Sequence, residues 1–78
     1  MKKIAVIGAG SWGTALAVML EQYGHDVTLW ARDQKAVEEM KKTRENKQYL
    51  PGVLLGEKLQ ITTDQKEAVE EKEIVISA

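Results

Sequence analysis

Residues 4–13 read Ile4-Ala5-Val6-Ile7-Gly8-Ala9-Gly10-Ser11-Trp12-Gly13. The apolar run at the start has no polar alternation, which predicts a strand buried on both faces, as in a parallel sheet. The stretch that follows has the pattern G-x-G-x-x-G. Alone this pattern is weak evidence, but here it follows a buried strand and opens a helix, which is the context the pattern requires. The segment therefore predicts a strand-to-helix corner with little side chain at the bend.

The rest of the chain alternates predicted helices and strands. Helices are expected at 12–23, at 34–44 and from Asp64 to about 71, and further strands at 27–30, 59–63 and 74–76. This alternation indicates an α/β fold, a parallel sheet with helices on both faces and right-handed crossovers. For these elements the doubly wound, Rossmann-type arrangement has the strand order 3-2-1-4. The first helix is apolar nearly all round, which predicts deep burial.

Each glycine of the corner has a separate predicted task. Gly8 allows the turn out of the strand, Gly10 lets a diphosphate approach the backbone, and Gly13 lets the helix pack close to the sheet. Free N–H groups at the helix start, together with the helix dipole, then receive phosphates. The corner therefore predicts a binding site for a dinucleotide, NADP or NAD. The alternative is a glycine-rich turn without a ligand.

Ser11 and Trp12, the two larger side chains inside the glycine pattern, are also assigned to the cofactor site. We expect Ser11 to hydrogen-bond a phosphate oxygen, and its alternative role is to cap the helix. For Trp12 the chemistry leaves two roles open. The indole either covers the cofactor near the nicotinamide or packs within the first turn of the helix.

The end of the second predicted strand bears on the cofactor preference. NAD-selective sites usually carry Asp or Glu there, which accepts a hydrogen bond from the ribose 2′-OH. This chain has Ala31, Arg32 and Asp33. Arg32 can pair with the 2′-phosphate of NADP and stack on the adenine, so we expect NADP to be accepted. The alternatives are a solvated Arg32 and an Asp33 that either binds the ribose or caps the next helix.

Composition excludes several classes of function. The net charge of −1 over 78 residues does not suggest a nucleic-acid or membrane partner recruited by charge. With no cysteine and one histidine, His25, we expect no zinc site. No run approaches the roughly 18 apolar residues of a membrane span. We expect a soluble, cytoplasmic protein.

The predicted strand at 74–76 keeps one edge unpaired, which native proteins avoid. We therefore expect residues 1–78 to be the N-terminal part of a dinucleotide-binding domain. The C-terminal substrate domain of the longer protein would then be absent from this chain.

The chain resembles the bacterial-type NAD(P)-dependent glycerol-3-phosphate dehydrogenases. The resemblance is carried by residues 3–17, residues 24–32, and Asn46 with Tyr49-Leu50-Pro51-Gly52. It covers essentially this whole chain but roughly the first quarter of a typical member. It implies an oxidoreductase that interconverts sn-glycerol 3-phosphate and dihydroxyacetone phosphate by hydride transfer and supplies phospholipid synthesis. The longer protein is also a candidate homodimer.

The same resemblance implies that Ser11, Trp12 and Arg32 touch the cofactor, and Tyr49 with them. From chemistry alone, Tyr49 is equally a packing anchor of its loop. The family's catalytic lysine and substrate-phosphate ligands lie beyond Ala78, so no catalytic residue is assigned and the chain alone is expected to be inactive.

Three other interpretations stay open. One is another reductase of the same superfamily, of the ketopantoate or 6-phosphogluconate type, against which Tyr49-Leu50-Pro51-Gly52 argues. Another is a non-catalytic nucleotide-binding module, although such regulators normally carry a DNA-binding element or a basic face. The last is a folding unit without cofactor affinity.

Overall fold

Strands and helices alternate along the chain, as the sequence predicts. A computed structural model describes residues 1–78. The elements in chain order are β1 (Lys3–Ile7), α1 (Ser11–Gln22), β2 (Asp26–Trp30), α2 (Gln34–Thr43), β3 (Gln60–Thr62), α3 (Gln65–Val69) and β4 (Ile74–Ser77). None of the helices combines the length and the apolar character needed to cross a membrane.

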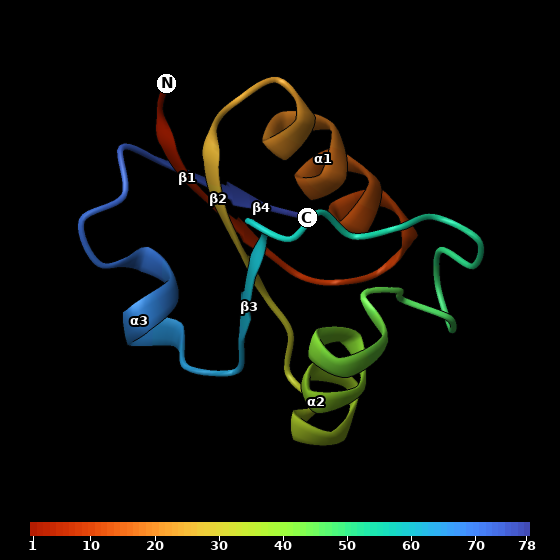
Figure 1. Ribbon diagram of the computed structural model, residues 1–78. Coiled ribbons are helices and arrows are strands. Elements are labelled where there is room, and N and C mark those ends of the chain that lie inside the picture. The colour runs from red at the N-terminus through yellow and green to blue at the C-terminus, as the bar shows by residue number, and fades with distance from the viewer.

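The strands form one parallel sheet in the order β3-β2-β1-β4, which confirms the predicted topology (Figure 1). At the centre, Val6 of β1 pairs with Leu29 of β2 and with Ile76 of β4. The last residue of β1, Ile7, pairs with Trp30, the last residue of β2. The carboxyl ends of these strands therefore meet at one edge of the sheet, and the glycine corner starts there.

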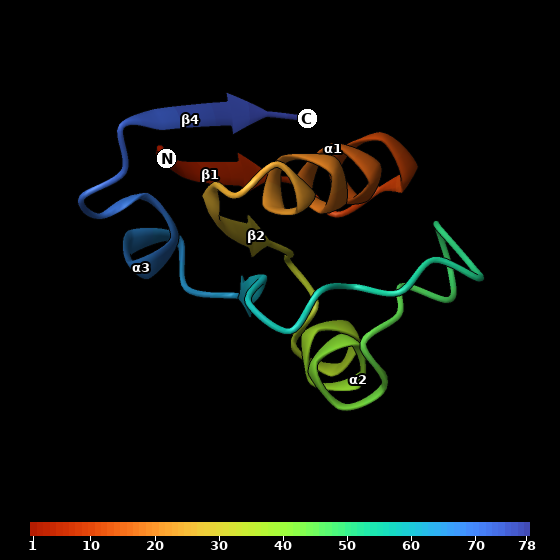
Figure 2. The same cartoon turned by 45° about the horizontal axis from the view of Figure 1, so that its top comes forward.

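Helices cover both faces of the sheet. Figures 1 and 2 show α3 on the opposite side of the sheet from α1 and α2. β1, one of the two inner strands, is buried from both sides, since Ile4, Ala5 and Val6 are all buried. This confirms what the uninterrupted apolar run of β1 predicts.

The prediction of deep burial for α1 is wrong. Gly13, Thr14, Ala17 and Val18 are buried, whereas Met19 is 44% exposed. A helix lying on a sheet buries only one face, and the apolar residues on the other face of α1 have no element over them. Trp30, the last residue of β2, is half-buried, and its Nε1 donates to the Thr63 carbonyl at 2.8 Å.

Aspartate side chains cap α2 and α3. Asp33 caps α2 by accepting from the Lys35 N–H at 2.9 Å. Asp64 caps α3 by accepting from the Glu67 N–H at 3.1 Å. Asp64 and Glu67 have the spacing of a capping box, in which the Glu67 side chain would accept from the Asp64 N–H. That hydrogen bond is missing, because the Asp64 N–H donates to Thr62 Oγ1 at 3.0 Å.

Glu73 joins the start of β4 to the start of β1. Its backbone N–H donates to the Lys3 carbonyl at 2.8 Å, and its Oε1 accepts from the Lys3 N–H at 3.0 Å. The hydrogen bond from the Lys3 backbone and the nearby Lys2 ammonium lower the pKa of Glu73 below its ordinary value of 4.5. These contacts align β4 with β1, so that Ala78 ends beside the glycine corner, where its N–H donates to the Ile7 carbonyl.

We expect Gly13→Ala to lower the free energy of unfolding by about 1–3 kcal/mol. An added Cβ would collide with the Gly8 carbonyl oxygen and lie 3.1 Å from the Ala78 Cβ. This clash outweighs the helix propensity of alanine, which favours it over glycine by about 1 kcal/mol. Urea unfolding followed by circular dichroism measures the difference.

The matched control is Gly10→Ala, where a Cβ meets no atom within 4 Å. We expect a smaller loss of stability there, of the order of a cap substitution. Equal stabilities for the two variants would contradict the close helix–strand approach at Gly13.

Candidate functional site

The corner between β1 and α1 is built almost entirely from backbone. The Gly8 N–H donates to the Trp30 carbonyl at 2.9 Å, which holds the corner against the end of β2. Gly8 has a φ of +118°, a conformation that favours glycine, and a Cβ there would lie 2.6 Å from the Ala78 carbonyl oxygen. The predicted strand-to-helix bend is confirmed, together with the turn and close-packing roles of Gly8 and Gly13.

Gly10 is the N-cap of α1, and no side chain caps this helix. The N–H groups of its first turn have no partner within the helix, as at any helix start. A Cβ on Gly10 would meet nothing within 4 Å, so the space beside this residue is open. The corner therefore presents main-chain donors and a positive helix end to open space, and both favour an anion.

A pocket of about 320 Å³ opens between this corner, the end of β2 and the loop after α2. Its lining residues are Ala9, Gly10, Ala31, Arg32, Asp33, Ala36, Met40, Asn46, Gln48 and Tyr49. The fold thus brings four of the predicted cofactor residues to one opening: Gly10, Arg32, Asp33 and Tyr49.

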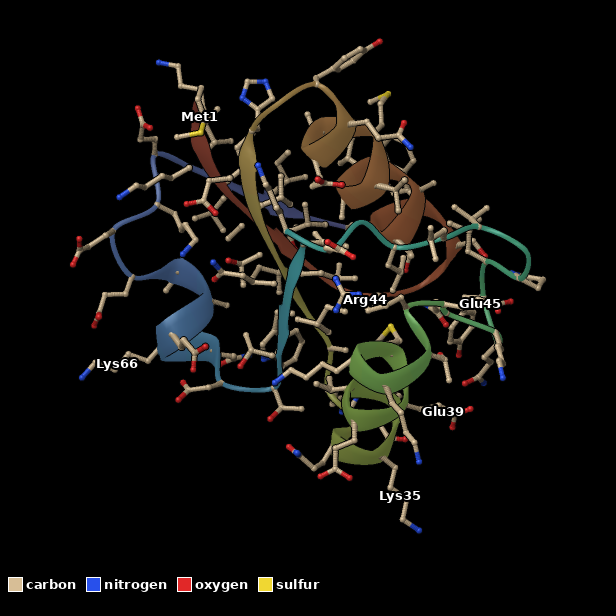
Figure 3. The ribbon with its side chains drawn as sticks, in the orientation of Figure 1. Met1, Lys35, Glu39, Arg44, Glu45 and Lys66 are labelled. Atoms are coloured by element: carbon tan, nitrogen blue, oxygen red, sulfur yellow. The ribbon has the colours of Figure 1, made fainter.

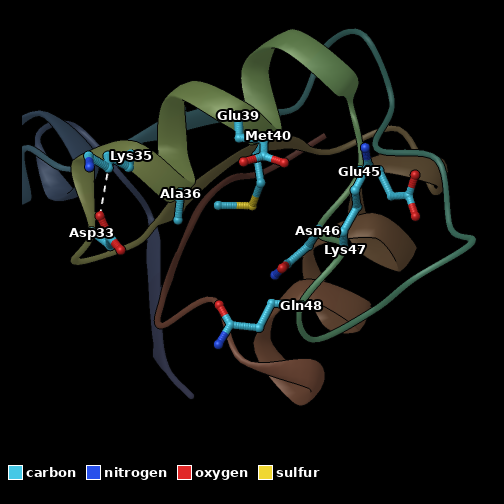
Figure 4. A pocket seen from close by; sticks show the side chains of 9 residues that line it. All are labelled: Asp33, Lys35, Ala36, Glu39, Met40, Glu45, Asn46, Lys47 and Gln48. Carbon is cyan, nitrogen blue, oxygen red and sulfur yellow. Dashed lines mark hydrogen bonds between the residues drawn. The ribbon is translucent and has the colours of Figure 1, made fainter.

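A second pocket of about 430 Å³ adjoins the first along α2. Figure 4 shows Asn46 and Gln48 extending from the loop into the space beneath Met40 of α2. The two pockets share Asp33, Ala36, Met40, Asn46 and Gln48. The opening at the corner therefore continues beneath α2, and Lys35 and Lys47 line the second pocket only.

Arg32 and Asp33 differ in what they do within the chain. Arg32 is exposed, and its guanidinium takes part in none of the hydrogen bonds or ion pairs of the molecule. Asp33 caps α2, so of its two predicted alternatives the cap is confirmed. Arg32 is the cationic side chain in the pocket of about 320 Å³ that is free to meet a ligand.

Ser11 joins the corner to the loop after α2. Its hydroxyl donates to the Tyr49 carbonyl at 2.7 Å. The alternative of a helix cap is wrong, because the cap position is Gly10 and no side chain fills it. A serine hydroxyl carries one proton. To donate to a phosphate oxygen, as predicted, Ser11 must release the Tyr49 carbonyl.

The two aromatic candidates lie at the surface. Trp12 is 65% exposed on the first turn of α1, so little of the indole packs within that turn. Tyr49 is 49% exposed and lines the pocket. Gly8 and Gly13 shape the corner but do not line the pocket. Ser11 and Trp12 do not line it either, and they lie on the first turn of α1.

Asn46 helps to hold the candidate site together, a role that was not predicted from the sequence, where Asn46 served only to support the family resemblance. It is 6% exposed, and its Nδ2 donates to the Ala9 carbonyl and to Thr14 Oγ1, both at 2.9 Å. Its Oδ1 accepts from the Tyr49 N–H at 3.3 Å. A nearly buried asparagine in a loop needs such partners. The signal in the sequence was Asn46 itself, a polar residue three positions before Tyr49-Leu50-Pro51-Gly52.

Arg44 was also missed, because the sequence places it inside the helix. It ends α2 in the left-handed conformation, with a φ of 56°. Its guanidinium donates to the carbonyls of Gly56 and Leu59, the latter at 2.8 Å. Figure 3 shows Arg44 reaching from the end of α2 toward the segment that leads into β3. Arg44 thereby fixes the far end of the loop that carries Asn46 and Tyr49.

Comparison with known proteins gives a consistent result. The family model for the NAD-dependent glycerol-3-phosphate dehydrogenase N-terminus matches residues 3–78. A protein of Fusobacterium nucleatum named glycerol-3-phosphate dehydrogenase (NAD(P)+) is 49% identical over the whole chain, which covers 23% of that protein. One of the same name from Thermoanaerobacter sp. is 54% identical over 97% of the chain and 23% of its own length.

A solved structure agrees with these sequence matches. The crystal structure of glycerol-3-phosphate dehydrogenase from Coxiella burnetii superposes with a TM-score of 0.91 at 38% identity, over 97% of this chain and 23% of that one. The chain thus spans about a quarter of the length of the relatives it matches.

Proposed function

We propose that this chain, which belongs to the NAD-dependent glycerol-3-phosphate dehydrogenase family, holds NADP or NAD as the N-terminal part of a dinucleotide-binding domain. One observation carries the proposal. At Gly10 the start of α1 is uncapped and the space a Cβ would occupy is open. A diphosphate can therefore approach main-chain N–H groups at the positive end of a helix.

Different residues around the corner contact different parts of the cofactor. The diphosphate lies against the first turn of α1, with Gly8 and Gly13 keeping the corner narrow and Ser11 exchanging its Tyr49 partner for a phosphate oxygen. The adenosine half enters the pocket lined by Arg32, Asp33 and Tyr49. Trp12, exposed on the same turn as Ser11, covers the cofactor toward its nicotinamide end.

Arg32 decides the preference between the two cofactors. Its exposed guanidinium stands where NAD-selective sites usually carry an acidic residue. It pairs with the 2′-phosphate of NADP, and its planar face stacks on the adenine of either cofactor. Both cofactors are accepted, and NADP gains an ion pair that NAD lacks.

The reaction belongs to the longer protein. Its relatives are named glycerol-3-phosphate dehydrogenase (NAD(P)+). We propose that it moves a hydride between the nicotinamide and carbon 2 of sn-glycerol 3-phosphate, with the hydroxyl proton passing to a base, to interconvert this substrate and dihydroxyacetone phosphate. The catalytic groups lie outside residues 1–78. From the family resemblance we propose a cytoplasmic homodimer that supplies phospholipid synthesis.

We expect NADPH and NADH to change the tryptophan fluorescence of the chain in a saturable way, because Trp12 stands beside the cofactor. Gly10→Ala should raise both dissociation constants by tenfold or more, on the order of one lost charge-assisted hydrogen bond. Circular dichroism of the variant controls for folding. Absence of saturable binding by the unaltered chain, or unchanged binding by the variant, contradicts the proposal.

We expect Arg32→Ala to weaken NADPH binding about tenfold or more while NADH binding changes much less. The reason is that only NADPH carries the 2′-phosphate. Lys42→Ala, which removes the same charge from an exposed position on α2, is the matched control and should leave the ratio of the two affinities unchanged. Equal losses for both cofactors in Arg32→Ala would exclude a contact with the 2′-phosphate.

For the longer protein we expect oxidation of NADPH in the presence of dihydroxyacetone phosphate, followed by absorbance of the reduced nicotinamide. Ketopantoate is the control substrate and should give no turnover. The opposite substrate preference would move the protein to another reductase of the superfamily and leave its cofactor site intact.

A further inference from the structure

Asn46 joins segments of the candidate site that are far apart in the sequence. Its carboxamide lies between the glycine corner, the first turns of α1 and the loop at Tyr49. Both Nδ2 donors are used, one on the Ala9 carbonyl and one on Thr14 Oγ1. Few side chains can copy this arrangement, since aspartate has no donor and serine is shorter.

The hydrogen bond from Asn46 to the Ala9 carbonyl also fixes the orientation of the peptide between Ala9 and Gly10. The peptide between Ala9 and Gly10 is planar and trans, so its C=O and N–H point in opposite directions. When Asn46 holds the Ala9 oxygen, the direction of the Gly10 N–H is fixed as well. That N–H belongs to the open backbone at which the diphosphate is proposed to bind.

The contact with Thr14 is made to its side-chain Oγ1 and anchors the first turn of α1. Thr14 is fully buried, and its N–H donates to the Gly10 carbonyl at 3.0 Å, which closes the first turn of α1. A single side-chain amide therefore holds the peptide before the helix and the turn that follows it.

We propose that Asn46 is a positioning residue of the dinucleotide site, whose carboxamide orients the Ala9–Gly10 peptide and the first turn of α1 to receive the diphosphate. This rests on the proposed function and adds to it a residue outside the glycine pattern. Asn46 reaches the cofactor through the backbone that it orients.

Asn46→Asp tests the proposal, because aspartate has the same shape but offers the Ala9 carbonyl an oxygen in place of an N–H. Gln48→Glu is the matched control, since Gln48 lines the same pocket and the change adds the same charge. We expect the dissociation constant for NADPH to rise about tenfold or more beyond that of Gln48→Glu.

The outcomes separate this inference from the proposed function. Equal dissociation constants for Asn46→Asp and Gln48→Glu overturn the positioning role and leave the cofactor site standing. Failure of the unaltered chain to bind NADPH overturns the proposed function itself.

A measurement on the unaltered chain applies if Asn46→Asp does not fold. We expect the side-chain amide protons of Asn46 to exchange with solvent at least about tenfold more slowly than those of exposed Gln48, with and without NADPH. The Gly10 N–H resonance should shift when NADPH is added. Fast exchange at Asn46 in the complex, or an unmoved Gly10 resonance, overturns the proposal.

Discussion

The approach of Gly13 to the carbonyl of Gly8 is the contact on which the rest of the molecule depends. Because neither residue has a side chain, α1 can begin directly after β1 and lie close to the sheet. At Gly10, the N-cap of α1, the space that a Cβ would occupy is also open, so the first N–H groups of the helix face open space. The glycine corner thus combines the close strand–helix approach of a βαβ unit with an uncapped helix start, which is an arrangement that favours anions.

The parallel sheet turns this corner into part of a larger site. The hydrogen bond from Gly8 to Trp30 places the corner beside the end of β2, which brings Arg32 to the same opening. The loop after α2 closes the opening through Asn46 and through the hydroxyl of Ser11. The opening is therefore an assembly of segments whose positions are set by hydrogen bonds between residues far apart in the sequence.

Local patterns in the sequence were enough to predict the fold. The apolar run of β1, the glycine spacing and the cap at Asp33 depend on near neighbours in the sequence, and the element order and strand order were predicted correctly. The burial of α1 was wrong because composition does not say which face a sheet covers. Ser11 lies 38 residues from its partner Tyr49, and Asn46 lies 37 residues from its partner Ala9. No local pattern encodes such pairings.

The most direct measurement of the central claim is a crystal structure of the chain grown with NADPH. We expect diphosphate oxygens about 3 Å from main-chain nitrogens within residues 10–13, with no side chain between them. Cofactor bound elsewhere on the molecule, or a diphosphate held only by side chains, would contradict it.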